Sequence, residues 1–360
     1  MFRTLAVLCT CLLSAALSAD NDDWTAIIRQ QPYLDSIGMV DNLTTIRQWV
    51  LMGQSYCEQP DRHILFDDRG RFVGWMSDAE TDAETQEKLN ERRQTLVEQG
   101  RVDTWLPGSE SSRGYPFALA CDQPHVDVPL AMARLFGTSP EDRLWGTWDG
   151  LTAGSVEQPV SLAELVTQVW KHRQAGFDDP LESIHLEQFM AQLVVESGAV
   201  KQAQSADNAI GILQLRRQAL DDCGLDARFY RHRMAQVDCA ARLYVLIRRN
   251  LQPVFEQRFG HLPADKQQAL FARLLMQTYH SGVGHMTELL TGRELGKAAA
   301  YFAEHHERFS ADEIATGLLY HNLGRPPWGW ESLVYLIDID IVTTEICRND
   351  SSLGCSVVND

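Results

Sequence analysis

The chain has 360 residues, of which 44% are hydrophobic and 22% are charged, and these values are typical of a folded globular protein. They exclude a disordered, collagen-like or multi-span membrane protein, and they leave room for one large or two modest domains. The formal net charge of −17 argues against a protein that binds duplex nucleic acid, because such binding needs clustered cations that displace counterions from phosphates.

The first residues predict a cleaved secretory signal. Arg3 precedes an apolar run at residues 5–13, and a stretch of small residues follows that run. The run is shorter than the roughly 20 residues that a membrane span needs, and the best later candidate, Leu333–Val342, contains two aspartates. We therefore expect a signal peptide at residues 1–19, no membrane span, and an exported protein that is soluble in the periplasm.

The segment after the signal has a mixed character. A helix is predicted near Asn42–Tyr56, and the turn-forming residues 67–70 separate two apolar runs, which predicts a β-hairpin. Ser77 and Glu80 have the spacing of a capping box and precede a charged helix at Glu84–Gln99. No motif that carries chemistry occurs in this part of the chain.

Charge and turn formers divide the chain in two. Residues 20–170 contain 25 acidic and 12 basic side chains, whereas residues 171–360 contain 24 acidic and 19 basic ones. The turn formers of Gly146–Pro159 mark a boundary. The expected fold class is α+β overall, in which a mixed α/β N-terminal domain of unrecognised fold precedes a mainly α domain. We expect an acidic accessory domain at 20–160, a helical domain at 161–345, and a C-terminal tail at 346–360.

The second part of the chain is predicted to be almost entirely helical, because its apolar residues recur at helical spacing. Pro253 should end or kink the third of its helices. The predicted helices are Ser183–Glu196, Ala209–Leu220, Arg231–Leu251, Pro263–Tyr279, Gly284–Thr291, Arg293–His306 and Ala311–Tyr320.

Six cysteines remain after the signal, and an even number in an exported chain predicts disulfides. Proximity in sequence favours the pairs Cys57–Cys121, Cys223–Cys239 and Cys347–Cys355, among the 15 pairings that six cysteines allow. No Cys-x-x-Cys motif occurs, and the histidine spacing does not match a zinc site, so we expect neither a metal nor another cofactor.

One group of residues has the composition of a catalytic site. Glu196 follows two valines at the end of a predicted helix, and apolar neighbours raise the pKa of a carboxyl, so it can donate a proton near neutral pH. Ser205 lies nine residues after Glu196 and Gln214 eighteen after it. Gly211 allows the backbone to approach a ligand closely, and Gln214 offers both a donor and an acceptor to a polar substrate such as a sugar amide.

In type and spacing these residues resemble the bacterial lytic transglycosylases that have a soluble-transglycosylase, goose-lysozyme-like catalytic domain. The family pattern is Glu-Ser, a Ser nine residues after the Glu, and Ala-x-Gly-Leu-Met-Gln-Leu with the Gln eighteen after the Glu. Glu196, Ser205, Gly211 and Gln214 match it, as do Ala209 and Leu215. The resemblance covers about Phe177–Ile341, just under half of the chain.

Three later segments extend the resemblance. Tyr279-His280 begins a segment that is similar to the family's Ala-Tyr-Asn-Ala-Gly-x-Gly, and Tyr335 lies in one that is similar to its Glu-Thr-x-x-Tyr-Val. Tyr244 corresponds to a family Tyr on the helix between the Gln214 motif and the Tyr279 segment. The chain departs from the pattern at His280, where the family has Asn, and at Leu213, where it has Met; Asn208 stands where the family has Gly. A histidine at 280 is expected to titrate near neutrality.

The resemblance implies a lysozyme-like catalytic domain that cleaves the β-1,4 bond from N-acetylmuramic acid to N-acetylglucosamine in peptidoglycan glycan strands and leaves a 1,6-anhydro end. Glu196 would be the sole catalytic acid and base. The substrate-orienting residues would be Ser205, Gly211, Gln214, Tyr244, Tyr279, His280 and Tyr335.

Two other functions remain open on the sequence. A goose-type muramidase would use the same acid but release reducing ends through water, with Asp207 or Asp221 as a second carboxylate. A wall-binding or secretion-scaffold protein with a decayed site is the non-enzymatic alternative. Trp328 and Trp330 are interpreted either as a platform for sugars or as a packed turn.

Overall fold

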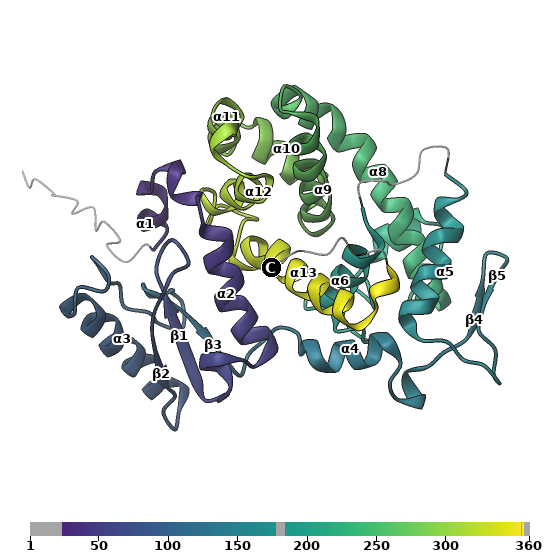
Figure 1. Cartoon of the computed structure of the whole chain (residues 1–360), viewed down its shortest axis with the longest axis horizontal. Coiled ribbons are helices and arrows are strands. Elements are labelled where there is room, and N and C mark those ends of the chain that lie inside the picture. Colours follow the sequence, from purple (N-terminus) through teal and green to yellow (C-terminus); the bar gives the residue numbers. More distant parts are fainter. Residues whose placement is uncertain (1–23, 178–183, 354, 356–360) are drawn as a thin grey trace, which may run out of the picture.

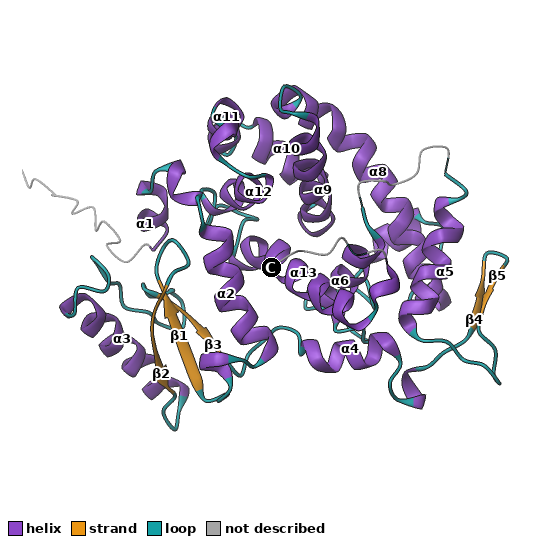
Figure 2. Cartoon of the chain, in the orientation of Figure 1, coloured by secondary structure: helices purple, strands orange, loops and turns teal. Residues whose placement is uncertain are grey.

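A computed structural model describes residues 24–177, 184–353 and 355 of the chain (Figure 1). The predicted signal peptide at 1–19 lies outside the described residues, as does part of the predicted tail. The fold is α+β and mostly helical, which agrees with the expected class (Figure 2).

The elements are as follows. The helices are α1 (Trp24–Gln30), α2 (Met39–Met52), α3 (Asp82–Glu98), α4 (Val128–Phe136), α5 (Leu162–Gln174), α6 (Leu186–Ser197), α7 (Arg217–Asp222), α8 (Arg233–Phe259), α9 (Ala264–Ser281), α10 (Val283–Thr291), α11 (Lys297–Glu304), α12 (Ala311–Tyr320) and α13 (Trp330–Asn349). The strands are β1 (Arg62–Phe66), β2 (Phe72–Ser77), β3 (Phe117–Ala120), β4 (Gly146–Trp148) and β5 (Leu151–Ala153).

Two small antiparallel sheets lie at opposite ends of the molecule (Figure 2). The larger has the strand order β2-β1-β3 and carries α3, and the smaller is the hairpin β4–β5. The predicted hairpin is confirmed as β1–β2. Its turn is held by Asp67, whose side chain accepts the backbone N–H of Arg69 and of Arg71.

The start of the charged helix differs from the predicted capping box. Ser77 is the last residue of β2, so it is engaged in the sheet. Thr81 is the N-cap of α3 instead, and its hydroxyl accepts the backbone N–H of Glu84. The helix therefore begins one turn after the predicted cap.

Helix α13 lies at the centre of the helical part and packs against α2, α6, α9 and α12. Its Asp338 is buried and accepts two hydrogen bonds of 2.8 Å from the guanidinium of Arg47 on α2. One continuous hydrophobic core includes residues on both sides of position 160, from Ile28 to Ile346. The N-terminal helices thus share a core with the helices that follow. None of the described helices is long and apolar enough to cross a membrane.

The predicted helices are confirmed with one large exception. Residues 209–215, predicted to begin a helix, belong to a tight loop at residues 203–215, and α7 begins only at Arg217. Pro253 does not end α8, which continues to Phe259, because Leu251, Phe255 and Phe259 keep one face of the helix buried. The helices α1, α4, α5 and α13 were not predicted from the sequence.

All three predicted disulfides are confirmed. Cys57–Cys121 joins the short turn after α2 to the residue that follows β3, and Cys223–Cys239 joins the end of α7 to α8. Cys347–Cys355 closes the C-terminal end of α13. The second bridge bears directly on the candidate site, because α8 and the loop before α7 both contribute to it.

Candidate active site

Glu196 is the penultimate residue of α6. Phe189, Met190 and Leu193 of this helix are fully buried, so its position is fixed by the core. The helix ends at Gly198, whose φ of 59° gives the left-handed conformation common after a helix. The side chain of Ser197 donates to the carbonyl of Ile212 at 2.8 Å and links the helix end to the tight loop.

The tight loop, residues 203–215, is held by hydrogen bonds at both ends. The Ser205 hydroxyl accepts the backbone N–H of Ala209 at 3.0 Å, and Ile210 pairs with Leu215 through two backbone bonds. The side chain of Gln214 donates to the carbonyl of Gly211 at 2.8 Å. Ser205 and Gln214 therefore shape the loop as well as facing the pocket described below.

Gln236 of α8 fastens the middle of this loop. It is fully buried; its Nε2 donates to the carbonyl of Ile210 at 2.9 Å, and its Oε1 accepts the N–H of Leu213 at 3.2 Å. A Cβ placed on Gly211 would lie 2.1 Å from Gln236 Nε2, and Gly211 has a φ of +75°. Glycine is therefore required at 211 so that Gln236 can reach the loop.

A chain of four side chains ends on the carboxyl of Glu196. The hydroxyl of Tyr335 on α13 donates to Glu196 Oε1 at 2.6 Å, and Gln192 Nε2 donates to the Tyr335 oxygen at 2.9 Å. The hydroxyl of Tyr244 on α8 donates to Gln192 Oε1. Tyr244 and Gln192 are fully buried, and Tyr335 is nearly so.

Two residues of α9 complete the surroundings. Tyr279 stacks on Tyr244 with ring centroids 5.3 Å apart and donates its hydroxyl to the carbonyl of Leu213 at 2.8 Å. His280 stacks on Tyr335 with centroids 4.5 Å apart. Desolvation by the surrounding protein lowers the pKa of His280 from 6.5, and the charge of Glu331 opposes this shift. The ring therefore charges at a lower pH than expected from the sequence.

These residues surround a pocket of about 440 Å³. Its walls are contributed by the end of α6, the tight loop, the middle of α8 and the end of α9. Five predicted site residues line it, namely Glu196, Ser205, Gln214, Tyr279 and His280. Tyr244, Tyr335 and Gly211 do not line it but lie behind it, where they hold the lining residues. A larger hollow of about 860 Å³ between α5 and the start of α6 contains none of the predicted site residues.

The pKa of the Glu196 carboxyl in the pocket wall is shifted toward neutrality. Burial raises its pKa from 4.5 to about 7, and the hydrogen bond from Tyr335 acts in the opposite direction. Burial dominates because it removes water from the charged form. A large fraction of the Glu196 carboxyls is therefore protonated at neutral pH, as a general acid requires.

Neither of the other two carboxylates considered from the sequence is held as a partner of Glu196. Asp207 lies at the pocket rim with its side chain 81% exposed and pairs with Arg216 at 3.7 Å. Asp221 accepts the hydroxyl of Tyr230 and is not part of the pocket wall. Trp328 and Trp330 are buried, so the turn that contains them is packed and offers no platform.

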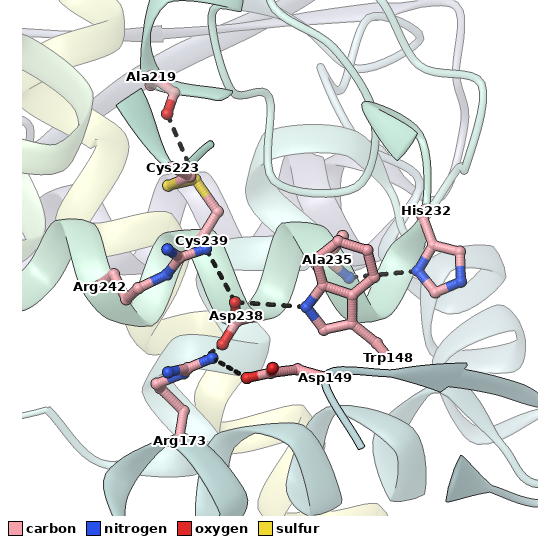
Figure 3. A network of polar contacts seen from close by, with 10 residues as sticks. All are labelled: Trp148, Asp149, Arg173, Ala219, Cys223, His232, Ala235, Asp238, Cys239 and Arg242. Carbon is pink, nitrogen blue, oxygen red and sulfur yellow. Dashed lines mark hydrogen bonds and ion pairs between the residues drawn. A yellow bond between two sulfur atoms is a disulfide. The ribbon is translucent and has the colours of Figure 1, made fainter. Parts of the chain in front are cut away.

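A polar network anchors the first half of α8, which supplies Gln236 and Tyr244 (Figure 3). Asp238 is buried and accepts hydrogen bonds from Arg173 of α5, from Arg242 and from the indole N–H of Trp148 on β4. Arg173 also pairs with Asp149 at 2.7 Å. The hairpin β4–β5 and α5 thereby hold the helix on which the inner wall of the site depends.

Sequence reasoning did not identify Gln192 and Gln236. Each is a buried glutamine inside an otherwise apolar helix face, and buried amides are almost always hydrogen-bonded. That conflict with the apolar pattern is the signal that marks them, although it does not name their partners.

Comparison of the sequence with models of protein families gives no match, and a search of curated proteins gives no significant match. Among the described residues, no group of three or more His, Cys, Asp and Glu side chains is placed to hold a metal ion.

Proposed function

We propose that this protein is a lytic transglycosylase of peptidoglycan, with a lysozyme-like catalytic domain at residues 161–345. The observation that carries the proposal is a single carboxyl, Glu196, whose burial raises its pKa to about 7 at the wall of a pocket. The spacing of Ser205, Gly211 and Gln214, which resembles the transglycosylase pattern, supports the same assignment.

One acid is sufficient for this reaction. Glu196 gives its proton to the glycosidic oxygen between N-acetylmuramic acid and N-acetylglucosamine. The resulting carboxylate takes the proton of the muramyl C6 hydroxyl, and that oxygen attacks its own anomeric carbon. An ordinary glycosidase needs a second carboxylate for a nucleophile or a water, whereas an internal hydroxyl supplies the nucleophile at high effective concentration.

The pocket wall supplies polar groups for the sugar. Ser205, Gln214 and His280 present a hydroxyl, an amide and an imidazole toward a polar ligand. The predicted signal at 1–19 would bring the protein to the periplasm, and the disulfides fit that oxidising compartment.

The test is digestion of purified sacculi with the protein and with Glu196→Gln, followed by mass analysis of the released fragments. Fragments with anhydro ends, lighter than reducing ends by one water, support the proposal, provided that Glu196→Gln releases none. Asp207→Asn is the matched control and should retain most of the activity. Reducing ends would assign a muramidase instead, and equal background release by the protein and by Glu196→Gln would leave a scaffold role.

A further inference from the structure

The hydrogen bonds that link Tyr244, Gln192, Tyr335 and Glu196 have only one direction of donation that satisfies the buried groups. The Tyr244 hydroxyl is fully buried, and within the described residues its one hydrogen-bond partner is Gln192. If the Gln192 amide were reversed, its NH₂ would point at the Tyr244 oxygen and the Tyr244 proton would have no acceptor. An unpaired buried hydroxyl is costly, so Gln192 presents its carbonyl to Tyr244.

This orientation determines what Tyr335 can do. The amide N–H of Gln192 points at the Tyr335 oxygen at 2.9 Å, so that oxygen is an acceptor from Gln192. The Tyr335 proton must then be directed to its other close neighbour, Glu196 Oε1, at 2.6 Å. Hydrogen bonds in such a chain also polarise one another, so the donation from Gln192 strengthens the donation from Tyr335.

We propose that Gln192 is a positioning residue, which fixes the hydroxyl of Tyr335 as a donor to Glu196 and so leaves the proton of the protonated carboxyl on Oε2. This inference rests on the proposed function in that Glu196 is taken as the general acid. Oε1 of Glu196 accepts the Tyr335 hydroxyl, so the acidic proton is not on the oxygen that faces the buried hydrogen bonds. It remains on Oε2, the oxygen that is available to a glycosidic bond.

The variants are designed to remove the fixed donor direction of the hydrogen bonds between Tyr244 and Glu196 and to change little else. Gln192→Met keeps the length of the side chain but removes both polar groups. Tyr244→Phe is the milder second variant, because it removes only the hydroxyl that orients the Gln192 amide. Gln277→Met is the matched control, since Gln277 on α9 is equally buried but its side chain has no hydrogen-bond partner among the described residues.

The readout is the titration midpoint of the Glu196 carboxyl, followed by NMR of protein with carbon-13 in its glutamate carboxyls and assigned with Glu196→Gln. Without Gln192, Tyr335 is a weaker donor and is free to accept from a protonated carboxyl. We expect Gln192→Met to raise the midpoint by about half a pH unit or more, and Tyr244→Phe to raise it by less. In a Tyr335→Phe background the same substitutions should add no shift, because the connection to Glu196 is already lost.

An unchanged or lowered midpoint in both variants, or an equal shift with and without Tyr335, would overturn the inference, as would a similar shift in Gln277→Met. If Gln192→Met does not fold, Tyr244→Phe decides. The titration needs no substrate, so a protein that fails to digest sacculi refutes the proposed function and leaves this test unaffected. Where sacculi are digested, the alkaline limb of the rate against pH should move with the midpoint.

Discussion

The raised pKa of Glu196 predicts that the native acid makes the protein less stable at neutral pH than a neutral replacement would. Glu196 has a pKa of about 7 in the folded protein and about 4.5 in the unfolded chain. Below pH 4.5 the carboxyl is protonated in both states and costs nothing. Between these values the unfolded chain ionises first, so folding stability falls as the pH rises, and above pH 7 the loss is complete.

The size of the loss follows from the difference between the two pKa values. About 2.5 pH units at roughly 1.4 kcal/mol per unit give about 3 kcal/mol at pH 8. Glu196→Gln has the same shape, carries no charge, and keeps a carbonyl that accepts the Tyr335 hydroxyl. It should therefore be about 3 kcal/mol more stable than the native protein at pH 8 and equally stable at pH 4.5.

The measurement is urea denaturation of both proteins at a series of pH values from 4.5 to 8. Glu187→Gln is the control, because it makes the same substitution in the first turn of the same helix, outside the pocket wall around Glu196. A stability difference between Glu196→Gln and the native protein that does not change with pH would refute the reasoning. A difference that grows toward acid would refute it as well, because it would mean that the folded state favours the ionised carboxyl.

Three further predictions concern the surroundings of this acid. Tyr335→Phe removes the hydrogen bond that lowers the pKa of Glu196, so the titration midpoint of the carboxyl, measured by carbon-13 NMR, should rise. Gly211→Ala should destabilise the protein by about 2 kcal/mol or more in urea denaturation, because its Cβ meets Gln236; Gly224→Ala, which has a similar φ and open space, should lose only about 1 kcal/mol. Asp338→Leu should cost about 3–5 kcal/mol, because it removes the carboxylate from the buried guanidinium of Arg47 and leaves His125 as its side-chain partner. Adding Arg47→Met should recover most of the loss, and failure of this second change to recover stability would contradict the account.

The sequence predicted the hairpin, most helices and two of the disulfides because each depends on local spacing. Turn residues and apolar periodicity act over short stretches of chain, and the cysteines of Cys223–Cys239 and Cys347–Cys355 are 16 and 8 residues apart. Cys57 and Cys121, 64 residues apart, are the two that remain once the nearer cysteines are paired. It also identified Glu196, Ser205, Gly211 and Gln214, whose spacing along the chain is fixed. Periodicity cannot predict which distant side chain meets an element, and so it did not anticipate that α2 would pack on α13.

The loop at 203–215 shows why one local prediction was wrong. The apolar residues from Ala209 to Leu215 have a spacing that suits a helix. Distant side chains, however, hydrogen-bond the backbone carbonyls that would otherwise accept helical hydrogen bonds. The carbonyl of Ile212 accepts from Ser197, and that of Leu213 accepts from Tyr279. Because these partners satisfy the backbone, the loop loses nothing by not forming helical hydrogen bonds.

The same reasoning explains why the two buried glutamines, Gln192 and Gln236, are important for the structure of the site. An apolar residue at 192 or 236 would fit the helix pattern better, and each amide is tolerated in the core because it pairs a buried donor. Gln192 accepts the hydroxyl of Tyr244, and Gln236 accepts the backbone N–H of Leu213. Gln236 holds the loop, which presents Ser205 and Gln214 to the pocket, and Gln192 holds Tyr335, which touches Glu196. An apolar substitution at either position leaves such a buried donor, the Tyr244 hydroxyl or the Leu213 N–H, without its acceptor. It should therefore cost more stability than the loss of one exposed hydrogen bond, and it should disturb the pocket from behind without touching a residue that faces it.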